Sequence, residues 1–226
     1  TCFEHNPDGA GFMFPYKGKV HIEKGFMTFK EFKTALKAVS KRYGIKNGGK
    51  DIPMVFHFRI TSQGAVCKEL THPFPICNDY DTMKLSSYDC ELALAHNGII
   101  DFASNYGVKD HNDTMEFIKN IVYNTINGDN KFFNNKNIDS MFDYLLQGNR
   151  VVFLNGNGDV KLYGNWEKDK GVFYSNTTYK EPKLSSFKKL TSSYPYSWYD
   201  EQYFQDEKTE KDKIYYWASK KQIKDL

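Results

Sequence analysis

Short apolar runs, most of them bounded by glycine, proline or asparagine, recur between residues 10 and 175 and predict β-strands. The run that ends at Phe14 is followed by a Lys-Gly-Lys tip at 17–19 and an alternating return over 20–24, which is the pattern of a hairpin. Further strands are expected at residues 55–59, 92–97, 151–154, 160–163 and 171–175.

Three other segments have apolar residues at helical spacing. The first follows Thr28, which suits an N-cap, and its apolar residues recur at i, i+3, i+7 and i+10 before Gly44 ends it. The second starts at Asp113, and a third, shorter helix is expected at 138–146. Because the strands come in hairpins with helices interposed, rather than in βαβ alternation, the predicted fold class is α+β with antiparallel sheets.

The composition changes after Lys180, where Ser, Tyr, Lys, Asp and Glu predominate. We therefore divide the chain into a domain at 1–180 and an aromatic, charged tail at 181–226. Within the tail, residues 212–223 have the spacing of a helix that could dock to a partner, with Ile214, Tyr215, Trp217 and Ile223 as its apolar positions. A disordered or self-packed tail is the favoured interpretation.

Charge and hydropathy exclude several classes of protein. The 31 basic and 28 acidic residues give a net charge of +3 and are spread along the chain, so the sequence gives no electrostatic case for a nucleic-acid partner. No apolar run approaches the ~20 residues that a membrane helix needs, so no membrane partner is expected. The expected location is the cytoplasm, which would be the host cytoplasm for a phage protein.

Neither a metal nor a cofactor is expected. The glycines at 9–11 precede a strand, whereas a phosphate-binding loop precedes a helix. The histidines lie in or beside apolar strands without helical ligand spacing, so they are interpreted as structural imidazoles. Four cysteines are too irregularly spaced for a zinc knuckle or a CxxC motif, although in a secreted protein they could pair: Cys2, Cys67, Cys77 and Cys90.

Two of the expected strands end in residues that suit ligand binding. The strand at 55–59 ends in Arg59, whose planar guanidinium can donate two parallel hydrogen bonds to a carboxylate. The strand at 92–97 ends in Asn97-Gly98, which can offer a side-chain amide and a backbone N–H side by side to an oxyanion. Taken singly, Arg59 would more often be a salt-bridged strand end, and Asn97-Gly98 a hairpin turn.

Five motifs in order carry a resemblance to a known family: residues 6–11 (NPDGAG), 57–64 (HFRITSQG), 71–74 (THPF), 95–100 (AHNGII) and 112–114 (NDT). Over residues 1–180 the chain resembles class II glutamine amidotransferase domains, particularly the small stand-alone versions of bacteria and phages. The resemblance implies the N-terminal-nucleophile hydrolase fold, a four-layer αββα sandwich with two antiparallel sheets.

The resemblance also implies which residues would bind L-glutamine. Arg59 would pair with its α-carboxylate, helped by the hydroxyl of Ser62, and Asp113 would hold its α-ammonium. Ser62-Gln63-Gly64 stands where family members most often have Thr-His-Gly, so Gln63 takes the place of an imidazole. Asp8 and its glycine turn would form the floor of the nucleophile's pocket.

The implied activity is the hydrolysis of L-glutamine to glutamate and ammonia through a cysteinyl thioester. Asn97 Nδ2 and the Gly98 N–H would bind the oxyanion, and one such donor is typically worth ~3 kcal/mol of barrier. A separate synthetase or transferase would consume the ammonia. The sequence does not predict the oligomeric state.

The family's nucleophile is a cysteine at the mature N-terminus, with its own α-amine as base. Cys2 and Thr1 lie too close to Asp8 to leave room for the apolar strand that carries this nucleophile into the sheet, and Cys2 matches a helical position. We therefore expect the nucleophile upstream of Thr1. The alternative is a catalytically silent homologue whose glutamine pocket binds a ligand or a protein partner.

Overall fold

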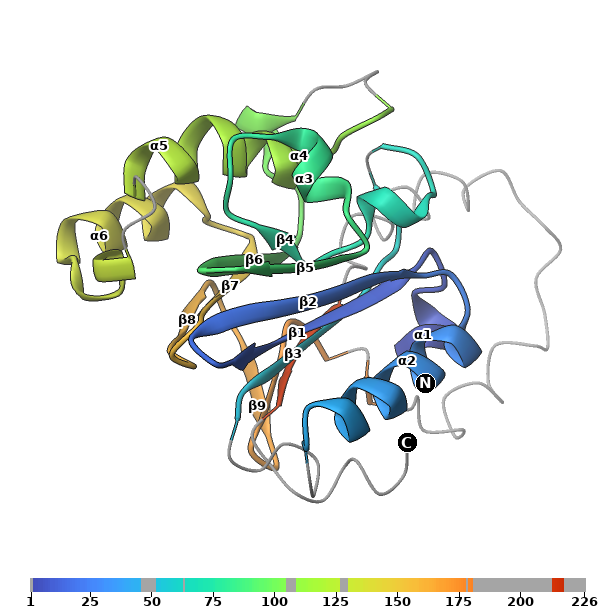
Figure 1. Cartoon of the computed structure of the whole chain (residues 1–226). Coiled ribbons are helices and arrows are strands. Elements are labelled where there is room, and N and C mark those ends of the chain that lie inside the picture. The colour runs from blue at the N-terminus through green and yellow to red at the C-terminus, as the bar shows by residue number, and fades with distance from the viewer. Residues whose placement is uncertain are drawn as a thin grey trace, which may run out of the picture.

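The chain has an α+β fold with two antiparallel β-sheets, as expected from the sequence (Figure 1). The computed structural model describes residues 2–45, 52–62, 64–104, 109–126, 130–177 and 179–180, together with the backbone of 213–217. Gln63, which the sequence places at the candidate site, lies outside these residues.

The larger sheet has seven strands in the order β5-β2-β1-β3-β11-β10-β9. Its strands are β1 (Ala10–Tyr16), β2 (Lys19–Phe26), β3 (Met54–Phe58), β5 (Ser87–Cys90), β9 (Glu167–Asp169), β10 (Val172–Tyr174) and β11 (Lys213–Trp217). The smaller sheet has the order β4-β6-β7-β8. Its strands are β4 (Phe74–Pro75), β6 (Leu92–Asn97), β7 (Arg150–Asn155) and β8 (Val160–Tyr163).

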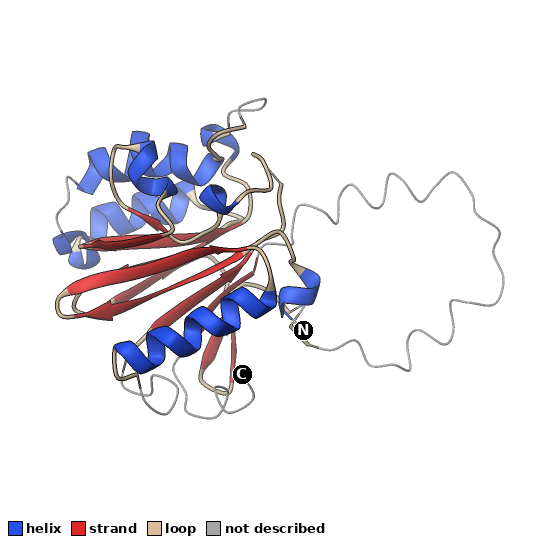
Figure 2. Ribbon diagram, turned by 45° about the vertical axis from the view of Figure 1, so that its right-hand side comes forward, coloured by secondary structure: helices blue, strands red, loops and turns tan. Residues whose placement is uncertain are grey.

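Helices cover the outer face of each sheet (Figure 2). The helices are α1 (Cys2–His5), α2 (Phe29–Arg42), α3 (Tyr80–Lys84), α4 (Asp113–Phe117), α5 (Tyr123–Ile126) and α6 (Lys136–Leu145). Short 3-10 turns lie at Lys68–Leu70, Asp101–Ala103 and Asn130–Asn134. Helix α2 packs on the seven-stranded sheet, and α3 to α6 lie on the side of the four-stranded sheet.

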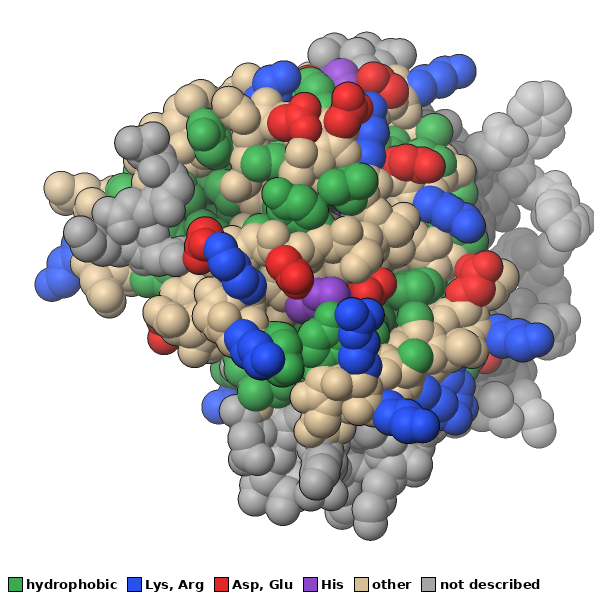
Figure 3. Space-filling view, in the orientation of Figure 1, with side chains coloured by type: hydrophobic (Ala, Val, Ile, Leu, Met, Phe, Trp, Pro, Cys, Tyr) green, Lys and Arg blue, Asp and Glu red, His purple; other side chains and the backbone are tan. Residues whose placement is uncertain are grey.

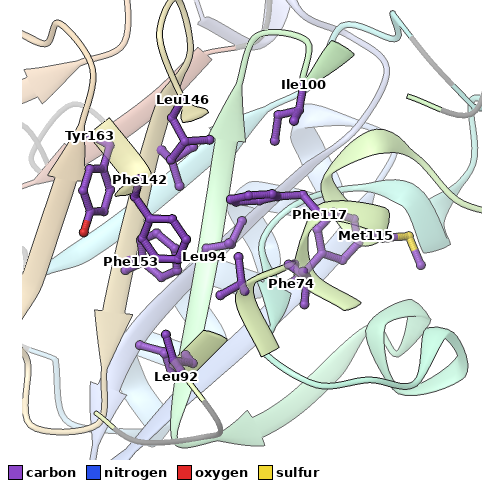
Figure 4. Close-up of a cluster of buried hydrophobic side chains, with 14 of the residues drawn as sticks. Phe74, Leu92, Leu94, Ile100, Met115, Phe117, Phe142, Leu146, Phe153 and Tyr163 are labelled. Atoms are coloured by element: carbon purple, nitrogen blue, oxygen red, sulfur yellow. The ribbon is translucent and has the colours of Figure 1, made fainter. Parts of the chain in front are cut away.

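Three buried clusters fill the spaces between these layers. The first joins the four-stranded sheet to its helices, and Figure 4 shows Phe142 of α6 gathered with Phe153 and Tyr163 of the sheet. The second joins α2 to the seven-stranded sheet. The third lies between the two sheets and pairs residues such as Met13 and Val55 with the small residues Ala93 and Ala95. The sheets are therefore stacked face to face.

The local signals at the start of the chain explain the first hairpin and helix. Lys17 and Gly18 have φ angles of 50° and 79°, the left-handed values that a tight two-residue hairpin turn requires. Thr28 caps α2 through a capping box, because its hydroxyl accepts from the Glu31 N–H while the Glu31 carboxylate accepts from the Thr28 N–H. Both elements agree with the sequence prediction.

The tip of this hairpin also touches the other sheet. A Cβ added at Gly156, in the turn between β7 and β8, would overlap the backbone of Gly18 and Lys19. The two turns can therefore approach only because Gly156 has no side chain.

The helix that begins at Asp113 is capped by Asn112, whose side chain accepts from the Met115 N–H at 3.0 Å. After Phe117 the helix widens into a π turn at Ile118–Val122 and then continues as α5. A π turn inside a helix changes which residues face the core, and here Ile118 and Val122 are both buried.

The predicted helix at 212–223 is wrong where it can be compared with the structure, because Lys213–Trp217 form strand β11. This segment consists of Lys, Ile, two Tyr and Trp, and β-branched and aromatic residues favour strands. The strand pairs with β3 on one side and β10 on the other, so its backbone hydrogen bonds are made within the sheet. Residues 212 and 218–223 lie outside the described part.

Among the described residues, no helix combines the length and the apolar character needed to cross a lipid bilayer.

Candidate functional site

Arg59 follows β3 directly and is buried, with 2% of its surface exposed. Its Nη1 donates to the Ala65 carbonyl at 2.8 Å, so the loop after β3 folds back over the guanidinium. Gly64, at φ 77°, lies within this loop, and a Cβ there would be 3.8 Å from Arg59 Nη2 and 2.7 Å from Leu70 Cδ1. A side chain at position 64 would overlap the end of the Leu70 side chain, and the positive φ also favours glycine there.

Asp8 is tied to the same loop. Its Oδ2 accepts from the Thr61 N–H at 2.8 Å, and its own N–H donates to the Arg59 carbonyl at 3.0 Å. The Arg59 N–H donates to the Gly9 carbonyl at 2.8 Å. Asp8 therefore fixes the backbone around Arg59, while Ser62, the predicted helper of Arg59, is exposed.

Asn97 ends β6, and only 2% of its surface is exposed. Its Nδ2 donates to the hydroxyl of Ser175, one residue past β10, at 3.0 Å. Gly98 follows at φ 130°, and a Cβ there would overlap Asn149 Oδ1. Glycine is required here both by the backbone angle and by the neighbouring amide.

Asp113 is joined to the segment that follows Asn97-Gly98. Its Oδ2 accepts from the Ile100 N–H at 2.8 Å, and its Oδ1 accepts from the Thr114 N–H at 2.8 Å. Only 5% of Asp113 is exposed. The carboxylate therefore connects the start of α4 to the end of β6.

The predicted residues thus come from segments that contact one another. The loop after Arg59 lies against the chain just before Asp113, because the Ala65 N–H donates to the Lys109 carbonyl at 3.3 Å. Asp113 in turn bonds the segment after Gly98. Arg59, Asp8 and Ser62 are contributed by the side of the larger sheet, and Asn97 and Gly98 by the smaller sheet.

A chain of hydrogen bonds behind these residues was not anticipated from the sequence. Thr114 Oγ1 lies 3.1 Å from His72 Nε2 and 2.9 Å from His96 Nδ1, and His96 Nε2 lies 2.8 Å from Asn149 Oδ1. The amide oxygen of Asn149 only accepts, so His96 carries its proton on Nε2 and accepts at Nδ1 from Thr114. Thr114 then accepts from His72 Nε2.

Burial favours the neutral form of three histidines in this region. Burial lowers the pKa of His57, His72 and His96 below the ordinary value, and the Arg59 charge adds to the effect at His57. At His96 the Asp113 carboxylate opposes the shift. The rings of His57 and His72 lie 4.3 Å apart between centroids, and they come from β3 and from the loop before β4.

Lys24 is a second buried cation that the sequence reasoning missed. Its Nζ donates to the carbonyls of Met83 at 2.5 Å and Glu69 at 3.1 Å, and it lies 3.9 Å from the Phe74 ring centroid. Burial lowers the pKa of Lys24 well below its ordinary value, and the charge of Arg59 lowers it further. The signal that could have found it is the alternation of this strand, which puts Lys24 on the same face as the apolar residues Val20 and Ile22.

The thiols with shifted pKa values are poor nucleophiles. Burial raises the pKa of Cys77, and it raises the pKa of Cys90 to about 12, so both thiols are protonated at neutral pH. Cys2 lies in helix α1, and a helical position is what the resemblance implied for this residue. Among the described residues, no group of three or more His, Cys, Asp or Glu could hold a metal ion.

Two cavities lie among the described residues, and the first adjoins the end of β6, because its lining residue Asn149 lies beside Gly98 and Arg150 is paired with Asn97. One, of about 330 Å³, is lined by residues that include Asn149, Arg150 and Asn165. The other, of about 710 Å³, lies beside Lys24 and α2. Neither is lined by Arg59, Asn97 or Asp113. Charges of both signs are mixed on the face shown in Figure 3.

Comparison of the chain with protein-family models, with curated proteins and with solved structures found no match.

Proposed function

We propose that this chain is the glutamine-binding domain of a class II glutamine amidotransferase, which hydrolyses L-glutamine to glutamate and supplies the ammonia to a partner synthetase or transferase. One observation carries the proposal: the loop after Arg59, the start of α4 at Asp113 and the end of β6 are held together by direct hydrogen bonds. Asp113 thus bonds the segment after Gly98 directly, and the loop after Arg59 bonds Lys109, four residues before Asp113.

The charges of these residues suit a free amino acid. Arg59 would bind the α-carboxylate through two parallel hydrogen bonds, and Asp113 would bind the α-ammonium. The side chains of Ser62 and Gln63 would contribute further hydrogen bonds, as the resemblance implies. Asp8 would act indirectly, because it already bonds the Arg59 carbonyl and the Thr61 N–H.

Asn97 and Gly98 would stabilise the oxyanion that forms when a thiolate attacks the side-chain carbonyl of glutamine. The Asn97 amide has two N–H groups, so it can donate one to Ser175 and the other to the oxyanion. Ammonia then leaves with a proton from the α-amine of the nucleophile, and water hydrolyses the thioester to glutamate. The nucleophile in this proposal is the N-terminal cysteine that the resemblance implies.

The arrangement of layers supports the finer assignment of the fold. Two antiparallel sheets are stacked on each other, with α2 outside one and α3 to α6 outside the other. We infer the four-layer sandwich of the N-terminal-nucleophile hydrolases from this stacking together with the five motifs.

Glutamine binding tests the proposal without requiring a nucleophile. In titration calorimetry we expect the chain to bind L-glutamine in preference to D-glutamine. Arg59→Lys keeps the charge but loses the planar fork, so we expect affinity to fall about tenfold or more. Arg42→Lys, at an exposed position of α2, is the matched control and should bind as the parent does. No binding by the parent chain would overturn the proposal.

A second experiment tests the chemistry in the protein that carries the nucleophile. Asn97→Ala should slow glutamate release by about 10²–10³-fold with little change in KM, because the lost N–H binds the oxyanion rather than the substrate. Asn157→Ala, in the exposed turn after β7, is the control. An unchanged rate would remove Asn97 from the mechanism.

A second candidate function is a catalytically silent homologue that binds glutamine or a protein partner. The observation that favours it is the hydrogen bond from Asn97 Nδ2 to Ser175, which already uses part of the oxyanion-binding amide. Binding of L-glutamine without any release of glutamate by the full-length protein would select this alternative.

A further inference from the structure

Strand β11 lies between two strands that do not pair with each other. Residues Lys213 to Trp217 are paired with Phe58 to Met54 of β3, and Tyr215 and Tyr216 are also paired with Tyr174 and Phe173 of β10. We call the space between β3 and β10 the β3–β10 slot. Strand β11 is therefore an inserted central strand, although it comes from the far end of the chain (Figure 1).

The direction of β11 places one end of the slot beside the candidate site. Strand β11 is antiparallel to both β3 and β10, so β3 and β10 run in the same direction. Their carboxyl-terminal ends therefore lie at the same end of the sheet. Arg59 comes directly after β3, and Ser175 comes directly after β10. The first residue of β11, Lys213, is paired with Phe58 and so lies at this end of the sheet.

A strand that runs in the direction of β11 would therefore begin next to Arg59 and Ser175. The Ser175 hydroxyl accepts the hydrogen bond from Asn97 Nδ2. An amino-terminal residue at the start of such a strand would lie beside Arg59 and near Ser175, the hydrogen-bond partner of Asn97. This is the position at which the proposed hydrolysis needs a nucleophile with a free α-amine.

The occupant of the slot also affects β10. Among the described strands, β10 pairs with β11 and β9 only. Because β9 is the outermost strand, β10 is connected to the rest of the sheet through β11. Any change of strand in the slot can therefore shift Ser175 relative to Asn97.

Strand pairing uses backbone groups, which every non-proline residue supplies, so one extended segment can replace another in the same slot. We propose that β11 is an exchangeable inhibitory strand, and that the β3–β10 slot binds the apolar strand bearing the nucleophilic cysteine when the enzyme is active. This inference rests on the proposed function and adds its regulation: the carboxyl-terminal tail and the nucleophile strand compete for one site.

The test compares two variants of the full chain at one position of β11. Tyr215→Pro removes a backbone N–H and is incompatible with a central strand, whereas Tyr215→Phe keeps the backbone group and is the matched control. The probe is a synthetic peptide with a free amino-terminal cysteine followed by alternating valine and threonine. We expect it to bind Tyr215→Pro at least tenfold more tightly than Tyr215→Phe. Equal affinity, or no binding to either variant, would overturn the proposal.

A measurement on the parent chain covers the case in which Tyr215→Pro does not fold. With the peptide in large excess, hydrogen exchange should show β11 amides losing protection while the β3 amides Met54–Phe58 keep theirs. Full protection of β11 at saturating peptide would contradict strand exchange.

Failure of the two proposals can be distinguished. If peptide exchanges with β11 but no variant binds L-glutamine, the strand exchange stands and the proposed function fails. If L-glutamine binds but the peptide does not displace β11, the proposed function stands and the regulation fails. The same peptide with serine in place of cysteine should bind equally well and support no release of glutamate.

Discussion

At the scale of single residues, the candidate site depends on glycines and buried polar groups rather than on exposed charges. Arg59, Asn97 and Asp113 are each at most 5% exposed. Gly64 adopts a left-handed φ in the loop after β3, and Gly98 lets β6 end against Asn149. Such positions tolerate substitution poorly, because a buried polar group that loses its partner costs about 1–3 kcal/mol.

Gly98→Ala tests this dependence. Its φ of 130° is outside the range of L-residues, which costs about 1–3 kcal/mol, and the added methyl group would overlap Asn149 Oδ1. Gly148→Ala is the control, because its φ is also positive, at 82°, but a Cβ there has open space around it. Urea unfolding should show a clearly larger loss of stability for Gly98→Ala. Equal losses would mean that the overlap is relieved without cost.

The buried histidines predict how stability depends on pH. The pKa values of His57, His72 and His96 are lowered in the folded chain, so the unfolded chain binds more protons as the pH falls below about 6.5. The free energy of unfolding should therefore fall below pH 6.5, by up to about 1.4 kcal/mol per pH unit for each histidine. His21 acts in the opposite direction, since carboxylate partners raise its pKa despite burial.

Unfolding by urea at pH 7.5 and 5.5 measures this effect. The parent chain should lose stability at the lower pH, and His72→Gln should reduce the difference because one titrating group is removed. A stability that is the same at both pH values would contradict neutral, buried histidines.

At the scale of secondary-structure elements, the sequence correctly predicts the helices and hairpins whose ends are set by neighbouring turn and cap residues. The β1–β2 hairpin and α2 follow from their turn and cap residues, and the helix at Asp113 begins where the sequence places it. Between residues 64 and 90, by contrast, no helix or strand is predicted from the sequence. The structure has β4, α3 and β5 there, and all three are short and stabilised by pairing or packing with distant residues.

The error at β11 has the same origin. Its residues satisfy a helical pattern and a strand pattern about equally well, because a five-residue apolar segment does not distinguish the two. The available edges of β3 and β10 decide the outcome, and these edges are not visible in the local sequence. The histidine network was missed for a related reason, since Thr114 and Asn149 are distant from His96 in sequence.

Thr28→Ala tests the local origin of α2. Loss of the hydroxyl leaves the Glu31 N–H without its cap, and the expected cost is about 1 kcal/mol. Thr34→Ala, at an exposed position inside the same helix, should instead be neutral or slightly stabilising, because alanine favours the helix. The midpoint of thermal unfolding should therefore fall for Thr28→Ala and stay the same or rise slightly for Thr34→Ala. A matching decrease in both would contradict the capping box.

At the scale of the whole molecule, the candidate site is assembled across the two sheets. Arg59 follows a strand of the larger sheet, and Asn97 ends a strand of the smaller one. The small residues Ala93 and Ala95 lie between the sheets and are fully buried. The distance between the predicted carboxylate clamp and the oxyanion amide therefore depends on how closely the sheets pack. The five ordered motifs indicated that their segments would meet, but their packing is visible only in the structure.

Ala95→Leu tests this dependence without touching either binding group. The added volume should cost about 1–3 kcal/mol of stability by overpacking the space between the sheets. If the proposed function is right, the added volume should also weaken the binding of L-glutamine, because Arg59 and Asn97 would move apart. Ala38→Leu, on the exposed side of α2, is the control for both measurements. If Ala95→Leu lowers the stability but leaves the affinity for glutamine unchanged, ligand binding does not depend on how closely the sheets pack.

The contact between Gly156 and the tip at Gly18 has a practical consequence for handling this protein. Hairpin tips are ordinarily where epitope tags and sequence insertions are accepted at little cost. Here the tip is seated against a turn of the opposite sheet, with no side chain between the two backbones to yield. A tag inserted after Lys17 would therefore force the turns at Gly18 and Gly156 apart, and labels for detection are better attached elsewhere.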